Sequence, residues 1–437
     1  MPTRRSFIMS AGAAIAAQKI SPATSAVPIP HAPALRWARG NATRLRGLNC
    51  LQPFGYGLAK NGSYLAEPYQ NGGTDLQVMP DPRLALIKST GFNFVRMCID
   101  PATLTTAADA TALKNLIAQL RTAILRRLAA GLLVIADLHV VGRPPVAGWS
   151  NRDIASGVSG TKFQRFIAIA QELSAAIEEL NAPQEVAIEL FNEPPNDSEI
   201  AGDSWPNLQA PYLWRAVRKA APHSTLLIGG SDYNSINGLA TLDPSNFDGN
   251  TMYTFHGYTP AQLTLQASPG LFQHIHALTF PPRRSERSAA IRRLIQSVRA
   301  DASLNTRHKI EMIVKLTRLR KNYGVDTYFD LPQNASYIVR QMKIVTDWAD
   351  SNGVPHNCII NGESGCNGDY NEDSKNVVGA PLITRTNVIR ALSQSADNAG
   401  FFGYVIHELQ GSGFAISDPH SFSFVPEIIA ALGIGPK

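Results

Sequence analysis

Short apolar runs recur along the chain, and each is followed by a longer stretch with a different spacing of apolar residues. The runs are rich in β-branched and aromatic residues, which is typical of buried strands. The longer stretches place apolar residues three and four positions apart, as amphipathic helices do, most clearly over 161–180 and 334–351. The predicted strands cover residues 44–50, 93–99, 132–139, 185–192, 225–230, 251–256, 357–363 and 401–407.

The alternation of strands and helices predicts parallel pairing, and eight such units predict a closed (β/α)8 TIM barrel of the α/β class. The alternative is an open, doubly wound sheet. Such a sheet normally carries a glycine-rich phosphate turn after its first strand. The corresponding segment, GLNCLQPFG (47–55), does not have the GxGxxG pattern.

The connection between the sixth and seventh predicted strands is unusually long. We interpret residues 270–330 as an insertion on the barrel rather than a second domain, so that 27–437 form one domain. Residues 283–321 contain twelve Lys or Arg and three acidic residues. A solvated helical insertion explains this charge better than nucleic-acid binding, because base-stacking aromatics are not interleaved with it. His274 and His276 are expected to be a helical surface pair rather than metal ligands.

Composition agrees with a folded globular protein. The chain has 437 residues, of which 44% are hydrophobic and 17% charged, so a large core is possible and disorder is not expected. The formal net charge of +6 comes from local segments rather than from the whole surface.

The first residues have the pattern of an export signal. Arg4 and Arg5 precede an apolar, small-residue run (7–17), and a small-residue site follows near Ala26. This predicts a twin-arginine-type signal peptide over 1–26 and a periplasmic or secreted protein without a membrane span. Export permits disulfides, and four cysteines allow three pairings between which the sequence does not choose. The cysteines are Cys50, Cys98, Cys358 and Cys366.

Polar residues gather at the predicted carboxyl ends of the strands, where barrel enzymes carry their active sites. The segment IELFNEPP ends an apolar strand on Asn192 and Glu193, and the seventh strand ends on Glu363. Two carboxylates across a barrel mouth suit glycoside hydrolysis, in which one is protonated and the other ionised. The other strand-end residues are Arg96, Asp137, His139, His256, Tyr258, His407 and Glu408.

Supporting roles follow from the residue types. Asn192 is placed to bond the sugar 2-hydroxyl, and Tyr258 to donate to Glu363 and keep it anionic. Arg96 would act on Glu363 through its charge. His139 and His256 would position hydroxyls or tune the acid.

An ordered set of motifs resembles glycoside hydrolase family 5, the cellulase family of clan A retaining barrels. The resemblance implies Glu193 as acid/base and Glu363 as nucleophile, with Arg96, His139, Asn192, His256 and Tyr258 around them. The family usually places a tryptophan at the end of strand eight as a stacking floor, whereas this chain has His407 there. The motifs are RGLN (46–49), GFNFVRM (91–97), VIADLH (134–139), IELFNEP (188–194), YTFHGYTP (253–260) and NGESG (361–365).

Trp149 and Trp205 are candidates for stacking on sugar rings in the cleft, with core packing as the alternative. The resemblance favours a retaining endo-β-1,4-glucanase, with β-mannanase or β-1,3-glucanase as alternatives. We expect a monomer that binds a polysaccharide and uses no metal, cofactor or nucleic acid. Two rivals remain open, a non-catalytic carbohydrate-binding protein on the same scaffold and an envelope protein that binds through the basic insertion.

Overall fold

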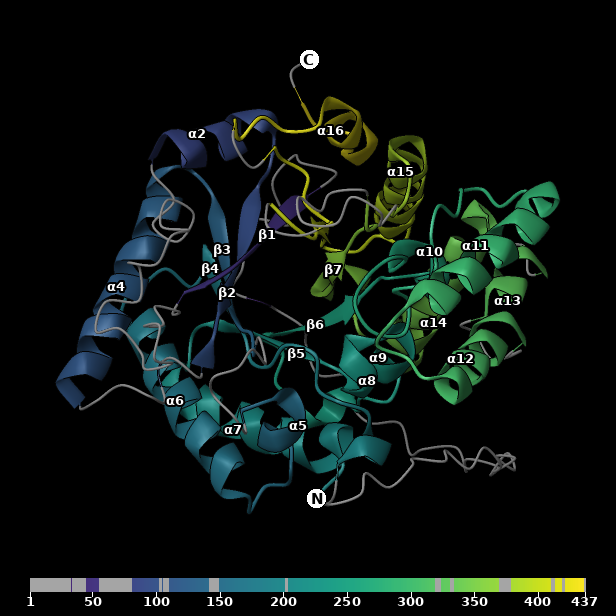
Figure 1. Cartoon of the computed structure of the whole chain (residues 1–437). Coiled ribbons are helices and arrows are strands. Elements are labelled where there is room, and N and C mark those ends of the chain that lie inside the picture. Colours follow the sequence, from purple (N-terminus) through teal and green to yellow (C-terminus); the bar gives the residue numbers. More distant parts are fainter. Residues whose placement is uncertain are drawn as a thin grey trace.

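The computed structural model describes residues 33, 45–54, 81–101, 104, 110–140, 149–200, 203–318, 324–330, 334–368, 379–409, 413–418 and 421–435. Parallel strands pair in chain order, and the last pairs with the first, so the sheet is a closed barrel (Figure 1). The predicted barrel is confirmed and the open sheet is excluded. The strands are β1 (Arg46–Phe54), β2 (Phe94–Ile99), β3 (Leu133–Leu138), β4 (Val186–Glu189), β5 (Thr225–Gly229), β6 (Thr251–His256), β7 (Ile359–Ser364) and β8 (Gly403–Ile406).

Helices lie between successive strands and surround the barrel (Figure 1). Most of them turn an apolar face to the strands, as α6 does with Phe163, Phe166 and Leu173. The helices are α2 (Asp81–Thr90), α4 (Ala110–Ala129), α5 (Asn151–Ile154), α6 (Thr161–Glu178), α7 (Ala210–Ala220), α8 (Ser231–Asn234), α9 (Ile236–Leu239), α10 (Ala261–Thr264), α11 (Arg287–Ala300), α12 (Thr306–Arg318), α13 (Val325–Asp330), α14 (Ala335–Asn352), α15 (Leu382–Asn398) and α16 (Pro426–Leu432).

The barrel interior changes from apolar to charged along its axis. Side chains alternate between the two faces of a strand, so every second residue points inward. On β2 the inward position after Phe94 is Arg96, and on β3 the one after Ile135 is Asp137. A charged layer therefore lies directly above an apolar layer of buried side chains. That apolar layer contains Leu45, Phe94, Ile135, Ala187, Leu227, Met252, Ile360, Phe402 and Val405.

A buried arginine ties the amino end of β1 to the last two helices. Arg46 is 1% exposed and donates two hydrogen bonds to the Asp397 carboxylate in α15, at 2.8 and 2.7 Å. It also donates to the carbonyl of Leu432 in α16 at 2.8 Å. A planar guanidinium suits the bidentate pairing with Asp397. These bonds join the first strand of the barrel to its last two helices.

An irregularity in β7 aims Glu363 into the barrel mouth. Phe255 pairs with Asn361, but the next residue, His256, pairs with Glu363, so Gly362 is an extra residue in β7. Such a bulge reverses the alternation of faces. A Cβ atom at Gly362 would lie 2.2 Å from the Thr254 hydroxyl oxygen, so only glycine fits there.

The connection between β6 and β7 contains α10 and α14 and, between them, α11, α12 and α13, which lie on one side of the barrel beside α14 (Figure 1). Leu294 and Val298 of α11 are buried and join the main core, whereas Ile310 and Val314 of α12 are 59% and 47% exposed. The connection is thus helical and packs on the barrel through α11. Our interpretation of 270–330 as an insertion in a single domain stays a prediction.

The predicted signal peptide (1–26) lies outside the described residues. Across the ranges that are described, none of the helices has the length and apolarity needed to span a bilayer. Each of the four cysteines is a buried free thiol, so none of the three possible disulfide pairings is present. Burial raises the pKa of the Cys50 thiol to about 11, which keeps it protonated and unreactive.

Candidate active site

The two candidate glutamates meet at the carboxyl end of the barrel. Glu193 follows β4, and Glu363 lies near the end of β7. One carboxylate oxygen of each and a ring nitrogen of His256 all lie within 4.8 Å of one another. The Glu193 side chain is 30% exposed and that of Glu363 only 6%. The two carboxylates therefore share one site but have different access to water.

Backbone geometry turns Glu193 toward the mouth. Its φ is +51°, a left-handed conformation that costs a non-glycine residue roughly 1–2 kcal/mol. The Asn151 side chain, at the start of α5, donates to the carbonyls of Asn192 and Glu193 at 3.1 and 2.8 Å. His256 Nδ1 lies 2.9 Å from a Glu193 oxygen. The surrounding structure thus holds a strained residue in place, as functional sites often do.

Donors surround both oxygens of Glu363. Tyr258 donates to Oε1 at 2.8 Å, while Asn49 and Arg96 donate to Oε2 at 2.8 and 3.1 Å. Burial by itself would raise the pKa of Glu363, but two neighbouring histidines and Arg96 outweigh it and hold that pKa well below the usual range. Burial and Glu363 together raise the pKa of Tyr258, which therefore stays a phenol and a donor. Glu363 is consequently held as an anion.

Arg96 is the centre of a buried charge network. Its guanidinium pairs with both oxygens of Glu189, at 2.7 and 2.8 Å, and with Asp137 at 3.0 Å. It also donates to the side-chain carbonyl of Asn192 at 2.9 Å. Arg96, Asp137 and Glu189 are fully buried, so each charge is stabilised only by its partners. Arg96 thereby links β2 with β3 and β4 as well as with Glu363.

His139 and Asn192 continue this network toward the opening. His139 Nδ1 lies 2.8 Å from Asp137 Oδ2, and its Nε2 lies 3.1 Å from the Asn192 amide nitrogen. Burial opposes protonation of His139, but the Asp137 carboxylate raises its pKa. Both residues lie at the site, where the sequence placed them. Asp137 holds His139, and Arg96 holds Asn192.

His407 also reaches the site, from the end of β8. Its Nδ1 lies 3.3 Å from Glu363 Oε1 and 3.1 Å from the Asn49 amide nitrogen. Edge contacts with Tyr258 and Phe414 hold the ring, and the side chain is 12% exposed. The imidazole therefore contacts the candidate nucleophile directly.

The two candidate aromatics differ. Trp205 is fully buried, packs on Phe191 at 4.9 Å between ring centroids and donates to the carbonyl of Gly229 at 3.0 Å. The prediction that Trp205 stacks on substrate is therefore wrong: the apolar indole fills the core behind β4. Trp149 is half-buried and packs against the core from the segment before α5, so its role as a cleft residue stays a prediction.

The sequence had not pointed to Asn49 and Asn151, and it had named Asp137 only as a strand-end residue without a role. Asn49 contacts both Glu363 and His407, Asp137 holds His139 and Arg96, and Asn151 holds the Glu193 turn. Alternate residues of a strand lie on the same face, so Asp137, two residues before His139, was expected to point into the barrel with it. No sequence signal connected Asn151 with Glu193, because that contact depends on how a loop folds.

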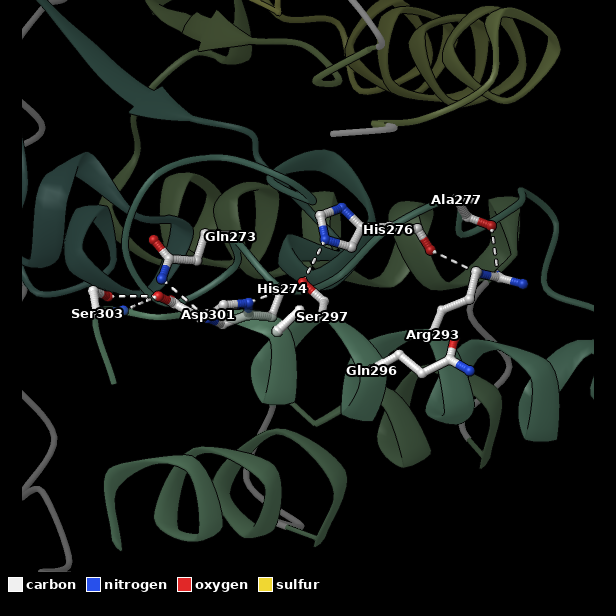
Figure 2. Close-up of a pocket in the computed structure, with 10 residues that line it drawn as sticks. Gln273, His274, His276, Ala277, Arg293, Gln296, Ser297, Asp301 and Ser303 are labelled. Carbon is white, nitrogen blue, oxygen red and sulfur yellow. Dashed lines mark hydrogen bonds and ion pairs between the residues drawn. The ribbon is translucent and has the colours of Figure 1, made fainter. Parts of the chain in front are cut away.

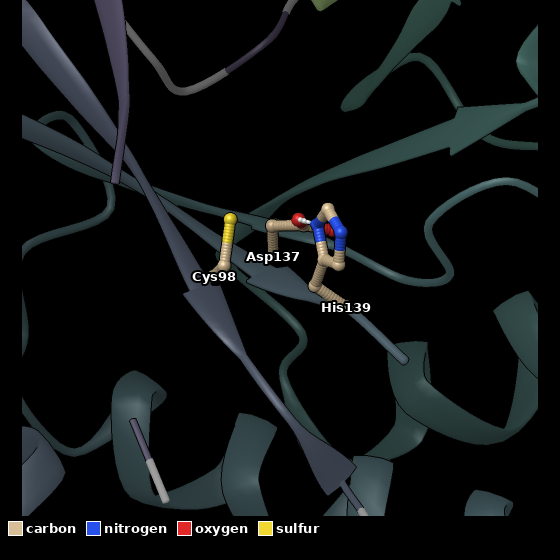
Figure 3. A group of neighbouring side chains, drawn as sticks. All are labelled: Cys98, Asp137 and His139. Atoms are coloured by element: carbon tan, nitrogen blue, oxygen red, sulfur yellow. Dashed lines mark hydrogen bonds and ion pairs between the residues drawn. The ribbon is translucent and has the colours of Figure 1, made fainter. Parts of the chain in front are cut away.

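Among the residues that the structure describes, two groups of side chains lie close enough together to hold a metal ion. One is Cys98 with Asp137 and His139, shown in Figure 3, and the other is Glu193 with His256 and Glu363. Burial raises the pKa of Cys98 well above its usual value, so it is a thiol and a poor ligand. Both nitrogens of His139 already have hydrogen-bonding neighbours. The first group is better explained as part of the Arg96 network.

A separate cavity of about 840 Å³ lies between residues 273–277 and α11 (Figure 2). Ser297 Oγ lies 3.0 Å from both His274 Nδ1 and His276 Nε2. The prediction of a helical surface pair is wrong, because both histidines lie in a non-helical segment and His274 is 4% exposed. Burial lowers the pKa of His274.

Comparison with known proteins agrees with this architecture. The sequence model of the family "Cellulase (glycosyl hydrolase family 5)" matches residues 80–387. Among curated proteins none is similar enough to count as a match.

Several solved structures share the fold. The cellulose synthase subunit Z of Clostridioides difficile is 18% identical over 89% of this chain and 99% of its own, with a TM-score of 0.58. Endoglucanase Cel5A of Thermotoga maritima is 16% identical over 89% and 96%, with a TM-score of 0.58. A family 5 lichenase from Caldicellulosiruptor sp. F32 is 15% identical over 95% and 98%, with a TM-score of 0.56. At these identities the likeness shows the fold alone.

Proposed function

This chain belongs to glycosyl hydrolase family 5, the cellulase family, and on that premise we propose that it is a retaining, endo-acting β-glycosidase. Glu193 is the proposed acid/base and Glu363 the proposed nucleophile. The observation that carries the proposal is the meeting of these two carboxylates in contrasting environments. Their nearest oxygens lie within 4.8 Å, which favours retention, since inverting enzymes separate their carboxyl groups by about 6.5–9.5 Å.

The environments support these roles. Glu363 is buried among donors and positive charges that keep it ionised, as a nucleophile must be. Glu193 is more exposed and has a histidine rather than an arginine beside it, so it is free to exchange a proton with substrate and water. Pairs of carboxyl groups in unlike surroundings are the usual basis for dividing acid and nucleophile roles.

The proposed reaction has two steps. In the first, a Glu363 oxygen attacks the anomeric carbon, and the bond to the leaving sugar breaks as Glu193 gives its proton to the departing oxygen. In the second, Glu193 takes a proton from water, whose oxygen attacks the same carbon and releases Glu363 as a carboxylate. The Asn192 amide is placed to bond the sugar 2-hydroxyl, and Arg96 holds its carbonyl in position.

We propose a β-1,4-glucan as the substrate. The segment FHGYTPAQLTLQ (255–266) resembles bacterial endoglucanases that act on β-1,4-glucan, and endoglucanases are among the structures that share the fold. Mixed-linkage glucan, β-1,3-glucan and mannan are the alternatives, since one related structure is a lichenase and another holds mannotriose. The loops around the mouth select among these polymers.

The decisive experiment compares wild type with Glu193→Gln and Glu363→Gln on carboxymethyl cellulose, lichenan, glucomannan and laminarin. We expect wild type to release reducing ends from at least one polymer, with the product configuration retained by NMR, and both variants to lose this activity. If wild type cleaves none of the polymers yet binds one of them in a pull-down assay, the chain is a carbohydrate-binding protein and the proposal is wrong.

A further inference from the structure

The imidazole of His407 is held as part of the protein rather than presented to a ligand. Its ring makes edge-to-face contacts with Tyr258 and Phe414, with centroid separations of 6.1 and 5.1 Å. Only 12% of the side chain is exposed. A small ring flanked in this way offers little apolar face to a sugar, so stacking does not explain its place beside Glu363.

The amide of Asn49 has a defined orientation. Arg96 can only donate, so the Asn49 atom 3.2 Å from Arg96 Nη1 must be the carbonyl oxygen. The Asn49 NH2 group therefore faces the other way, toward Glu363 Oε2 at 2.8 Å and His407 Nδ1 at 3.1 Å. His407 Nδ1 thus lies between a donor, Asn49, and an acceptor, Glu363 Oε1 at 3.3 Å.

We propose that His407 is a positioning residue that controls the attacking oxygen of Glu363 through the proton on its Nδ1. The inference rests on the proposed function, because it takes Glu363 as the nucleophile. Without that proton, Nδ1 accepts from Asn49, and Tyr258 remains the donor on Glu363 Oε1. One lone pair of Oε1 is then available for attack.

With the proton in place, Nδ1 donates to Oε1, which then carries two donors and is a weaker nucleophile. The imidazolium charge also opposes the positive charge that develops on the sugar in the oxocarbenium-like transition state. Protonated His407 therefore gives a less active enzyme, although Glu363 is ionised in both forms.

Carboxylates face His407 from several elements. Glu363 comes from β7, Glu193 follows β4, and Glu408 is adjacent in the chain, with its Oε2 4.0 Å from His407 Nε2. The neutral neighbours are Asn49 from β1 and Tyr258 after β6. Burial opposes protonation of His407, but the carboxylates outweigh it and raise its pKa. His407, rather than Glu363, should then set the acid limb of the pH profile.

The first test measures kcat/KM against pH for wild type and His407→Gln on the polymer that wild type cleaves. Glutamine cannot take up a proton but can accept from Asn49. We expect its acid limb to move to lower pH, because the group that sets the limb changes from the imidazole of His407 to a carboxylate. His308→Gln, an exposed residue of α12, is the control and should keep the wild-type limb. If the acid limbs of kcat/KM fell at the same pH in wild type and His407→Gln, the inference would be overturned.

A second measurement does not depend on turnover. The ring signals of His407, assigned by their loss in His407→Gln, are titrated by NMR in wild type and in Glu363→Gln. The pKa of His407 should fall when Glu363 loses its charge, and an unchanged value would overturn the inference. Failure of wild type to cleave any glycan would instead overturn the proposed function, so the two failures are distinguishable.

Discussion

The barrel mouth and the α11–α12 surface both concentrate charge, but they do so in opposite ways. At the mouth, Arg96, Asp137 and Glu189 are fully buried and bonded to one another. On α12, Arg307 and Glu311 form an ion pair whose side chains are 80% and 55% exposed. The helical surface has more charged residues per length of sequence, whereas the charges at the mouth are buried. Burial, rather than the number of charges, separates the two.

The physical reason is the cost of removing charge from water. A buried ion is stable only if its partners replace its hydration, so its protonation state responds strongly to them. An exposed pair remains hydrated and gains little from its contact. Groups that are both buried and shifted in pKa gather at the mouth, which supports it as the candidate functional region.

The largest effect should follow loss of the nucleophile. Glu363→Gln keeps the shape and removes the attacking oxygen anion, so kcat should fall on the order of 10⁴–10⁶-fold. Reducing-end assays on the best polymer measure it, and Glu408→Gln, the buried neighbouring acid, is the comparison. If Glu363→Gln kept more than a tenth of the activity, the assignment would fail.

Loss of the acid/base should be large but should depend on the leaving group. Glu193→Gln is expected to lose about 10²–10⁴-fold on a polysaccharide, the usual contribution of proton transfer. On a dinitrophenyl β-cellobioside the first step should be nearly normal, because that leaving group needs no proton. An equal loss on both substrates would contradict the role of Glu193 as the acid.

Two buried arginines separate stability from activity. Arg96→Met removes the charge partner of Glu189 and one of the partners of Asp137, and Arg46→Met removes the bidentate partner of Asp397, so each should cost about 3–5 kcal/mol of unfolding free energy. Urea denaturation measures both. Arg46→Met should retain activity in its folded fraction, whereas Arg96→Met should lose it. Equal activities would show that the mouth network is only structural.

Acid should weaken the fold through Glu363. Because its pKa is lowered in the folded state, its stabilising contribution is present above the unfolded value of about 4.3 and is lost as pH falls toward the folded value. Below pH about 4.3, wild type should therefore lose unfolding free energy more steeply with pH than Glu363→Gln does. Parallel curves from urea denaturation between pH 3 and 6 would contradict the lowered pKa.

The smallest effect should come from the helical surface. Arg292, Arg299 and Lys315 are exposed, and changing all three to Gln should leave both glycan cleavage and stability unchanged within error. This variant tests the surface better than deletion of 283–321, which would remove Leu294 and Val298 together with their packing in the main core. Lost binding to anionic vesicles with normal cleavage would give the surface a role of its own.

Much of this architecture was predictable from local pattern. The predicted strands overlap all eight observed ones, because a strand buried on both faces must be a short apolar run between turns. The strand-end residues Arg96, His139 and Glu363 were found because parallel strands of a barrel end at one rim. Trp205 and the His274–His276 pair were misplaced, since burial of an individual side chain depends on what packs over it.

By itself the sequence determined the barrel, the order of its strands and the polar residues at their ends, because alternation and strand length are local properties. Tertiary structure alone decided the bulge at Gly362, the Asn151 bonds that hold Glu193, and the position of His407 Nδ1 between Asn49 and Glu363. These features join residues tens to hundreds of positions apart. Their geometry arises only when the sheet closes and its interior loses water.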